Sequence, residues 1–162
     1  MAEYTMTSPN NIRIKSLLLS DSKGMHTLLK QEGCIESEIK FTDEQKAIAL
    51  DEIQARIAKQ NKTDKQASAD MLLCVTGNKY LLADAKFNST NVKNISSTEL
   101  KSKLSSSKSL VLSDDFTYAN TFYVLFKQSV LTPTQYNRLK RQFAGKPQFR
   151  FMNAIEFWKL FE

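Results

Sequence analysis

Cysteine and histidine are scarce in this chain of 162 residues, which has two cysteines and one histidine. Cys34 and Cys74 are too few for a disulfide framework and form no Cys-x-x-Cys pair, so the composition argues against a Cys/His zinc site. A single histidine also argues against nucleases in which both the metal ligand and the base are histidines. A Ser-His-Asp or Cys-His site would have to use His26, which we interpret as structural, like both cysteines.

Long apolar runs are also absent. The longest, such as residues 122–126, fall far short of the roughly 20 residues that a membrane helix needs, and no charged start followed by an apolar stretch opens the chain. Glycine and proline are few, at four and three residues, and 41% of the residues are hydrophobic. We therefore expect a soluble, cytoplasmic protein with a flexible N-terminus over residues 1–11 and a single domain over residues 12–162.

Charge is divided unevenly along the chain. Residues 1–85 hold 11 Lys and Arg against 12 Asp and Glu, whereas residues 86–162 hold 12 against 5, a net charge of +7. A basic half beside a half that contains carboxylates suits a nucleic-acid enzyme, because cations bind phosphate and acids bind metal. The alternative is a solvated basic face with no partner.

A helix is predicted over residues 43–60. Thr42 and Gln45 have the spacing of a capping box, and acids follow the cap, where they face the positive end of the helix dipole. Apolar residues then recur on one stripe, at Leu50, Ile53 and Ile57. This pattern gives the helix its expected buried face.

Two apolar runs, residues 71–75 and 80–83, flank a turn at residues 76–79 and predict a hairpin buried on both faces. The remaining pattern predicts helices ending at Gly33 and over residues 97–106, 133–143 and 154–161, and strands over residues 34–41, 110–112, 122–126 and 149–152. This order predicts an α/β or α+β fold, with a central mixed sheet flanked by helices.

Charged residues stand where the two hairpin strands meet. Asp70 lies at the entry of the first strand, and Asp84-Ala85-Lys86 closes the second, so pairing brings both carboxylates and the ammonium to one end of the sheet. Paired carboxylates form a hard oxygen site that suits Mg²⁺, and a lysine two residues beyond the second acid points to the same face. Such a lysine can orient or help deprotonate a metal-bound water and stabilise the charge of a pentacovalent phosphate.

These residues resemble the PD-(D/E)xK nuclease superfamily, which has the restriction-endonuclease-like fold. Ser68-Ala69-Asp70 stands for the first acidic motif, with Ala69 in place of its proline, and residues 82–86 stand for the second, with Asp84 where Glu is commoner. The resemblance covers roughly residues 43–112. It implies a Mg²⁺- or Mn²⁺-dependent nuclease that hydrolyses phosphodiester bonds in DNA or RNA, with Asp70 and Asp84 holding the metal and Lys86 assisting catalysis.

An acid-x-Lys triplet alone is weak evidence, since the chain contains five. Only the triplet at Asp84 ends a fully apolar strand that follows another apolar strand with an aspartate at its start. Charges at the ends of buried strands cost desolvation energy unless they are paired or bind metal, which favours a functional site. In the alternative interpretation Asp84 and Lys86 merely flank a strand, Asp70 is a turn residue, and any ion pair is a solvated contact.

Members of this superfamily usually carry a glutamate on a helix before the first acidic strand. For this catalytic role we choose Glu44, with Glu52 second and Glu32, on the earlier helix, third. A solvated surface glutamate is the alternative for all three. The resemblance also implies a helix and a further strand after the second motif, which residues 97–106 and 110–112 can supply.

The basic half offers candidates for nucleic-acid contact, which are Lys93, Lys101, Lys103, Arg138, Lys140 and Arg141. Lys146 and Arg150 follow the last three, and Tyr136, Phe143 and Phe149 are interleaved with them. Such a surface fits phosphates and a stacked base, unless its aromatics belong to the core. The rival function is a non-catalytic module on the same fold that binds nucleic acid or a protein without a metal; a homodimer or a protein partner stays open.

Overall fold

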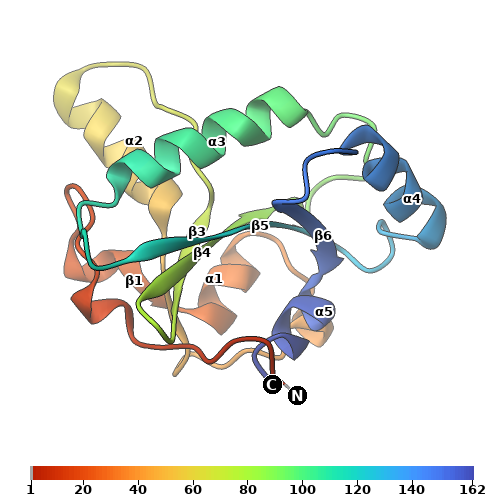
Figure 1. Cartoon of the computed structure of the whole chain (residues 1–162), viewed down its shortest axis with the longest axis horizontal. Coiled ribbons are helices and arrows are strands. Elements are labelled where there is room, and N and C mark those ends of the chain that lie inside the picture. The colour runs from red at the N-terminus through yellow and green to blue at the C-terminus, as the bar shows by residue number, and fades with distance from the viewer. Residues whose placement is uncertain (1) are drawn as a thin grey trace.

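The computed structural model describes residues 2–162, in which five α-helices flank a six-stranded sheet (Figure 1). The elements in chain order are β1 (Ser22–Gly24), α1 (Met25–Gln31), β2 (Lys46–Ile48), α2 (Leu50–Asn61), β3 (Met71–Val75), β4 (Lys79–Ala85), α3 (Ser97–Leu110), β5 (Thr117–Phe126), α4 (Pro133–Gln142), β6 (Phe149–Asn153) and α5 (Ala154–Lys159). The expected α/β fold with a central mixed sheet between helices is confirmed. Within the described residues, each helix is too short or too polar to cross a membrane.

The strands lie side by side in the order of the chain, from β1 to β6. Strands β1 to β4 are antiparallel, whereas β5 is parallel to β4 and β6 is parallel to β5. A parallel neighbour needs a connection that crosses the sheet. Helix α3 makes that connection between β4 and β5, and α4 makes it between β5 and β6.

The predicted hairpin is present as β3 and β4. Its register pairs Met71 with Ala83 and Val75 with Lys79. The turn between the strands uses left-handed backbone at Gly77 (φ 84°) and Asn78 (φ 53°), conformations that these two residue types adopt most easily. Continuing the register one step beyond Met71 and Ala83 sets Asp70 opposite Asp84.

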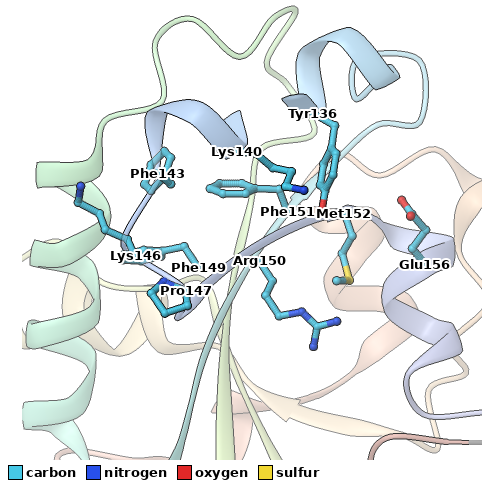
Figure 2. Close-up of a pocket in the computed structure, with 10 residues that line it drawn as sticks. All are labelled: Tyr136, Lys140, Phe143, Lys146, Pro147, Phe149, Arg150, Phe151, Met152 and Glu156. Atoms are coloured by element: carbon cyan, nitrogen blue, oxygen red, sulfur yellow. The ribbon is translucent and has the colours of Figure 1, made fainter. Parts of the chain in front are cut away.

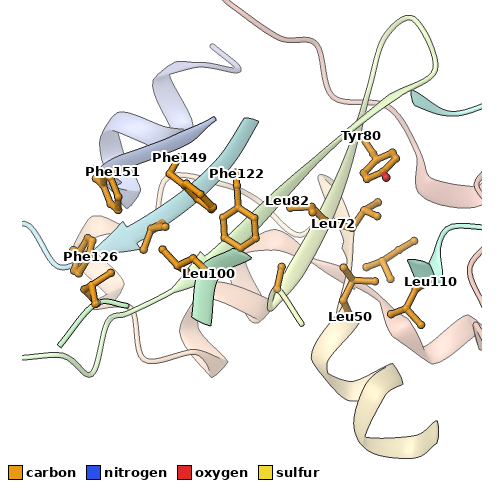
Figure 3. Close-up of a cluster of buried hydrophobic side chains, with 14 of the residues drawn as sticks. Leu50, Leu72, Tyr80, Leu82, Leu100, Leu110, Phe122, Phe126, Phe149 and Phe151 are labelled. Atoms are coloured by element: carbon orange, nitrogen blue, oxygen red, sulfur yellow. The ribbon is translucent and has the colours of Figure 1, made fainter. Parts of the chain in front are cut away.

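Each face of the sheet packs against its own helices, because successive strand residues point to opposite faces. On one face, helices α2, α3 and α4 pack against a cluster that includes Leu72, Leu82, Phe122, Val124 and Phe151 (Figure 3). On the other face, helices α1 and α5 pack against the intervening strand residues, which include Leu73, Leu81, Ala83, Tyr123 and Leu125. Residues of β3, β4 and β5 are therefore buried on both sides.

Three sequence-based elements differ in the structure. The helix predicted over residues 43–60 begins only at Leu50, because Thr42 and Gln45 close a tight turn instead and residues 46–48 join the sheet as β2. The strand predicted over residues 34–41 is a short 3-10 turn followed by irregular backbone. Of residues 110–112, predicted as a strand, Leu110 ends α3 and Val111 makes a single β-bridge with Ile14, and the strand after that helix is β5.

Residues 5–7, which belong to the segment expected to be flexible, pair with strand β3 of the sheet. Met6 forms a β-bridge with Val75, the N–H of Thr7 donates to the carbonyl of Cys74 (2.9 Å), and the N–H of Thr76 donates to the carbonyl of Thr5 (2.9 Å). Strand β2 pairs with β3 only at Ile48 and Leu72, so the other end of β3 keeps free backbone groups. Residues 5–7 satisfy those groups, which a buried strand requires.

Candidate functional site

Two carboxylates and an ammonium meet where β3 begins and β4 ends. Asp70 immediately precedes β3, Asp84 is the penultimate residue of β4, and Lys86 follows that strand. The backbone N–H of Ala85 donates to Asp70 Oδ2 at 2.7 Å, which holds the first acid against the second strand. The structure therefore brings Asp70, Asp84 and Lys86 together at one end of the hairpin.

Asp84 is completely buried, and only one of its two carboxylate oxygens has a partner among the described residues. Its Oδ2 lies 2.9 Å from the Nζ of Lys103 and 3.2 Å from the Nζ of Lys86, so two ammonium groups share one carboxylate oxygen. Its Oδ1 is buried and has no hydrogen-bond partner among residues 2–162. A buried carboxylate oxygen without a partner is costly, so Asp84 has capacity for a further cation or donor.

One stripe of α3 covers the acid pair. Glu99, Lys103 and Ser107 are spaced four residues apart, which sets them in a row on a helix. Ser107 accepts a hydrogen bond from the N–H of Ala69 (2.8 Å), Lys103 binds Asp84, and Glu99 lies 3.4 Å from Lys86 and 3.5 Å from Lys103. Sequence reasoning missed Glu99 and Ser107 and gave Lys103 another role, although their spacing is visible in the sequence.

Burial and the adjacent carboxylate make Asp70 a weak acid. Desolvation, together with the negative charge of Asp84, raises the pKa of Asp70 to about 8, although the N–H of Ala85 acts in the opposite direction. Near neutral pH Asp70 is therefore protonated for much of the time. A cation between the two acids would replace that proton, because it stabilises the ionised form.

Lys103 and Glu99 stay charged in this cluster. Burial lowers the pKa of the Lys103 ammonium, but the charges of Asp84, Asp70 and Glu99 outweigh it, so the pKa is raised above its ordinary value. Burial raises the pKa of Glu99, but Lys86 and Lys103 outweigh it, so the pKa is lowered. Together these charges hold the side chain of Lys86 beside Asp84.

Glu44, our first choice among the glutamates, lies far along the sheet from Asp70. It is exposed in the turn before β2, and because β2 is antiparallel to β3 through Ile48 and Leu72, that turn lies toward the Val75 end of β3. The expectation that Glu44 lies on a helix is wrong, since α2 begins at Leu50. Glu52 does lie on α2, where it forms an ion pair with Lys23 at 2.6 Å.

Glu32, our third choice, is the glutamate that shares the electrostatic environment of the acid pair. It caps the C-terminus of α1, and Gly33 beside it adopts φ +100° so close to the loop after β4 that a Cβ there would lie 2.8 Å from Asn88 Oδ1. Desolvation raises the pKa of Glu32, and the charges of Asp51, Asp84 and Glu52 add to that effect. The end of α1 therefore abuts the chain that carries Lys86.

The donor set of this site suits a hard cation with few protein ligands. Across residues 2–162, His, Cys, Asp and Glu side chains form no group of three or more that is arranged to hold a metal ion. Mg²⁺ commonly binds through one or two carboxylates and keeps several waters. Asp70 and the unpaired Oδ1 of Asp84 are compatible with that mode of binding.

The six candidates for nucleic-acid contact fall into three places. Lys103 is committed to Asp84, with 16% of its side chain exposed. Lys93, in the loop before α3, and Lys101, on α3, are exposed. On α4, Lys140 and Arg141 are exposed and Arg138 is half-buried. These positions leave five of the six accessible to a phosphate.

His26 and the two cysteines lie apart from this chemistry. His26 contacts Glu36 at 2.7 Å. Cys34 and Cys74 are buried free thiols, and desolvation raises their pKa values to about 11 and about 12, which disfavours the thiolate that a nucleophile needs. The acid pair is therefore the strongest candidate site.

Comparisons of the chain with protein-family models, curated proteins and solved structures found no match.

Proposed function

We propose that this chain is a metal-dependent nuclease of the PD-(D/E)xK type that hydrolyses phosphodiester bonds in DNA or RNA. The observation that carries the proposal is the buried Asp84 carboxylate, which has one oxygen without a hydrogen-bond partner in the described part of the chain, lies beside Asp70 and contacts Lys86 at 3.2 Å. The order of elements supports it, since the hairpin of β3 and β4 is followed by a helix, α3, and a further strand, β5.

Within this proposal Asp70 and Asp84 would hold Mg²⁺ or Mn²⁺ through their carboxylate oxygens. The ion would supply Lewis-acid polarisation of the phosphodiester and a more acidic bound water. The ammonium of Lys86 stabilises the negative charge that develops on the phosphate, and Lys103 and Glu99 position Lys86 and Asp84. Glu32 replaces Glu44 as our candidate for the glutamate of the helix.

A non-catalytic nucleic-acid-binding module is the second candidate function. Its supporting observation is that Lys86 and Lys103 already neutralise Asp84, a balance that requires no metal. In that case the charge cluster fastens α3 to the end of the hairpin. The basic residues after position 85, with a net charge of +7 over residues 86–162, still attract phosphate.

Cleavage by the Lys86→Ala variant separates the two candidates. We expect the wild-type chain with Mn²⁺ to cleave at least one substrate among single-stranded and duplex DNA and single-stranded and structured RNA. Lys86→Ala should lower that rate about 100-fold or more while retaining the fold and the thermal stabilisation by Mn²⁺, because an ammonium stabilises the transition state without ligating the metal.

Lys46→Ala is the matched control, since Lys46 is exposed and ends another acid-x-Lys triplet, Glu44-Gln45-Lys46. It should cleave at the wild-type rate. Equal activity in Lys86→Ala and wild type would show that the assigned site is wrong. No cleavage of any substrate, together with no stabilisation by Mn²⁺, would favour the binding module.

A further inference from the structure

A second cleft lies at the far edge of the sheet, along β6. It has a volume of about 360 Å³ and is bordered by α4, the loop after it, β6 and the start of α5 (Figure 2). Strand β6 is the last strand of the sheet and pairs only with β5. The volume lies within the range of about 300–1,000 Å³ that is typical of small-ligand sites.

The rim of this cleft is positively charged. Lys140, Lys146 and Arg150 border it, against one carboxylate, Glu156. Glu156 accepts a hydrogen bond from the N–H of Asn153 at the start of α5, and Arg150 is paired with Glu3 at 3.1 Å. Among residues 2–162, Lys140 and Lys146 have no carboxylate within ion-pair distance. Two lysine charges are therefore available to an anion.

Aromatic side chains form the rest of the wall. Phe143 and Phe151 pack with their ring centroids 4.9 Å apart and belong to the core, but both border the cleft. Tyr136 is 39% exposed, and the Nζ of Lys140 lies 5.7 Å from the centroid of its ring. An exposed aromatic ring beside unpaired lysines suits a ligand with a planar base and a phosphate.

The cleft and the acid pair lie at the same level of the sheet. Asp84 is in register with Val124 of β5, and Val124 is in register with Phe151 of β6. Neighbouring strands are about 4.8 Å apart, so the backbones of Asp84 and Phe151 lie roughly 10 Å apart. Residues in register share a face, and that face is the one covered by α3 and α4.

We propose that this cleft binds one nucleotide of a single-stranded nucleic acid, with Lys140 and Lys146 on the phosphate and the base against Tyr136. An unpaired strand is required, because a base inside a duplex is stacked and paired and does not enter a cleft. The inference deepens the proposed nuclease function and rests on it for the substrate class. Binding to the cleft itself requires no cleavage.

Fluorescence anisotropy in EDTA, with no divalent metal, tests binding separately from cleavage. The probes are labelled 12-mers of dT and rU and a labelled DNA duplex. The double variant Lys140→Gln/Lys146→Gln should bind both single strands about tenfold more weakly at low salt. Its slope of log affinity against log salt should be smaller by about 0.7, because one phosphate contact is lost.

The tyrosine provides an independent measurement. Tyr136→Leu should weaken single-strand binding about five- to tenfold and leave duplex binding unchanged, whereas Tyr136→Phe should restore it, because the ring makes the contact. The matched charge control is Lys59→Gln/Lys79→Gln, which removes two exposed lysines away from the cleft. That control should lose less than about threefold, and circular dichroism should show all variants folded.

Equal binding by the two double-lysine variants, or equal losses for duplex and single strands, would overturn the cleft assignment. The same oligonucleotides with Mn²⁺ report cleavage separately. Weaker binding in the cleft variants supports the cleft even where the wild type cleaves none of them, and in that case the nuclease proposal fails alone. If the cleft variants change neither cleavage nor binding, the nuclease proposal stands and the cleft proposal is overturned.

Discussion

Asp21 and Asp84 are both buried aspartates, with 1% and 0% of their surface exposed, yet their surroundings differ. Both oxygens of Asp21 are satisfied. The guanidinium of Arg56 donates to Oδ1 at 3.1 Å and to Oδ2 at 2.6 Å, and the N–H of Leu18 donates to Oδ2 at 2.7 Å. This two-pronged arrangement matches carboxylate geometry and fastens the loop before β1 to α2.

Asp84 has more charge around it and fewer satisfied atoms. Two lysines contact its Oδ2, its Oδ1 has no partner among the described residues, and Asp70 adds a second carboxylate. Because Asp70 is protonated for much of the time near neutral pH, its hydroxyl is a donor beside Asp84, and a cation between the two acids would replace that proton. The difference identifies Asp21 as a structural carboxylate and Asp84 as the one with capacity for a ligand.

The largest expected effect is on cleavage. If the chain is the proposed nuclease, Asp84→Asn should lower the rate about 100-fold or more, equivalent to roughly 2.7 kcal/mol of transition-state stabilisation, because it removes a charge that would hold the metal. Asp21→Asn should keep the rate per folded molecule within about threefold. Initial rates with Mn²⁺, measured well below the melting temperature of both variants, test this. Equal losses in both variants would remove the distinction between the two aspartates.

For stability, loss of the partner of Asp21 should cost more than loss of a partner of Asp84. Arg56→Ala leaves Asp21 buried without its partner and should lower the free energy of unfolding by about 2–4 kcal/mol, or roughly 5–12 °C in Tm. Lys103→Ala should cost less, about 1–2 kcal/mol, because Asp84 keeps Lys86. Urea and thermal unfolding followed by circular dichroism measure both. A larger cost for Lys103→Ala would indicate that the acid cluster is structural.

Metal binding should stabilise the folded protein through Asp84 and not through Asp21. A ligand that binds only the folded state at ten times its Kd adds about 1.4 kcal/mol, so Mg²⁺ or Mn²⁺ should raise Tm by roughly 3–5 °C. Asp84→Asn should abolish this increase, and Asp21→Asn and Glu44→Gln should retain it. Thermal unfolding with and without the metal gives the comparison. An increase that persists in Asp84→Asn would place the metal elsewhere.

The remaining prediction is a pH dependence of stability. The pKa of Asp70 is about 8 in the fold, above its ordinary value of about 3.9. The folded state therefore binds more protons than the unfolded state between these values, and stability falls as pH rises through that window. Asp70→Asn removes the titration, so its Tm relative to wild type should rise as the pH is raised from 5 to 9. A constant difference would contradict the raised pKa.

Patterns within short stretches of sequence predicted the helices and strands that depend mainly on neighbouring residues. The hairpin of β3 and β4 follows from two apolar runs around a Gly-Asn turn, and α4 follows from Pro133 in its first turn. The charges at the hairpin end were predictable for the same reason, since a short turn sets the register. Thr42 and Gln45 show where local patterns fail as predictors. Their spacing is that of a helix cap, but they close a turn, because residues 46–48 pair with β1 and β3 in the sheet.

The sequence by itself predicted an α/β or α+β fold with a central mixed sheet. It also determined the buried hairpin and the meeting of Asp70, Asp84 and Lys86, because the hairpin and this meeting depend on residues less than 20 positions apart. The tertiary structure decided that Glu32 approaches this site while Glu44 lies toward the other end of β3, and that Lys103 and Glu99 cover it. It also decided that the cleft along β6 lies level with Asp84. The physical reason is that strand order and helix packing bring these segments together, and neither follows from the periodicity of one segment.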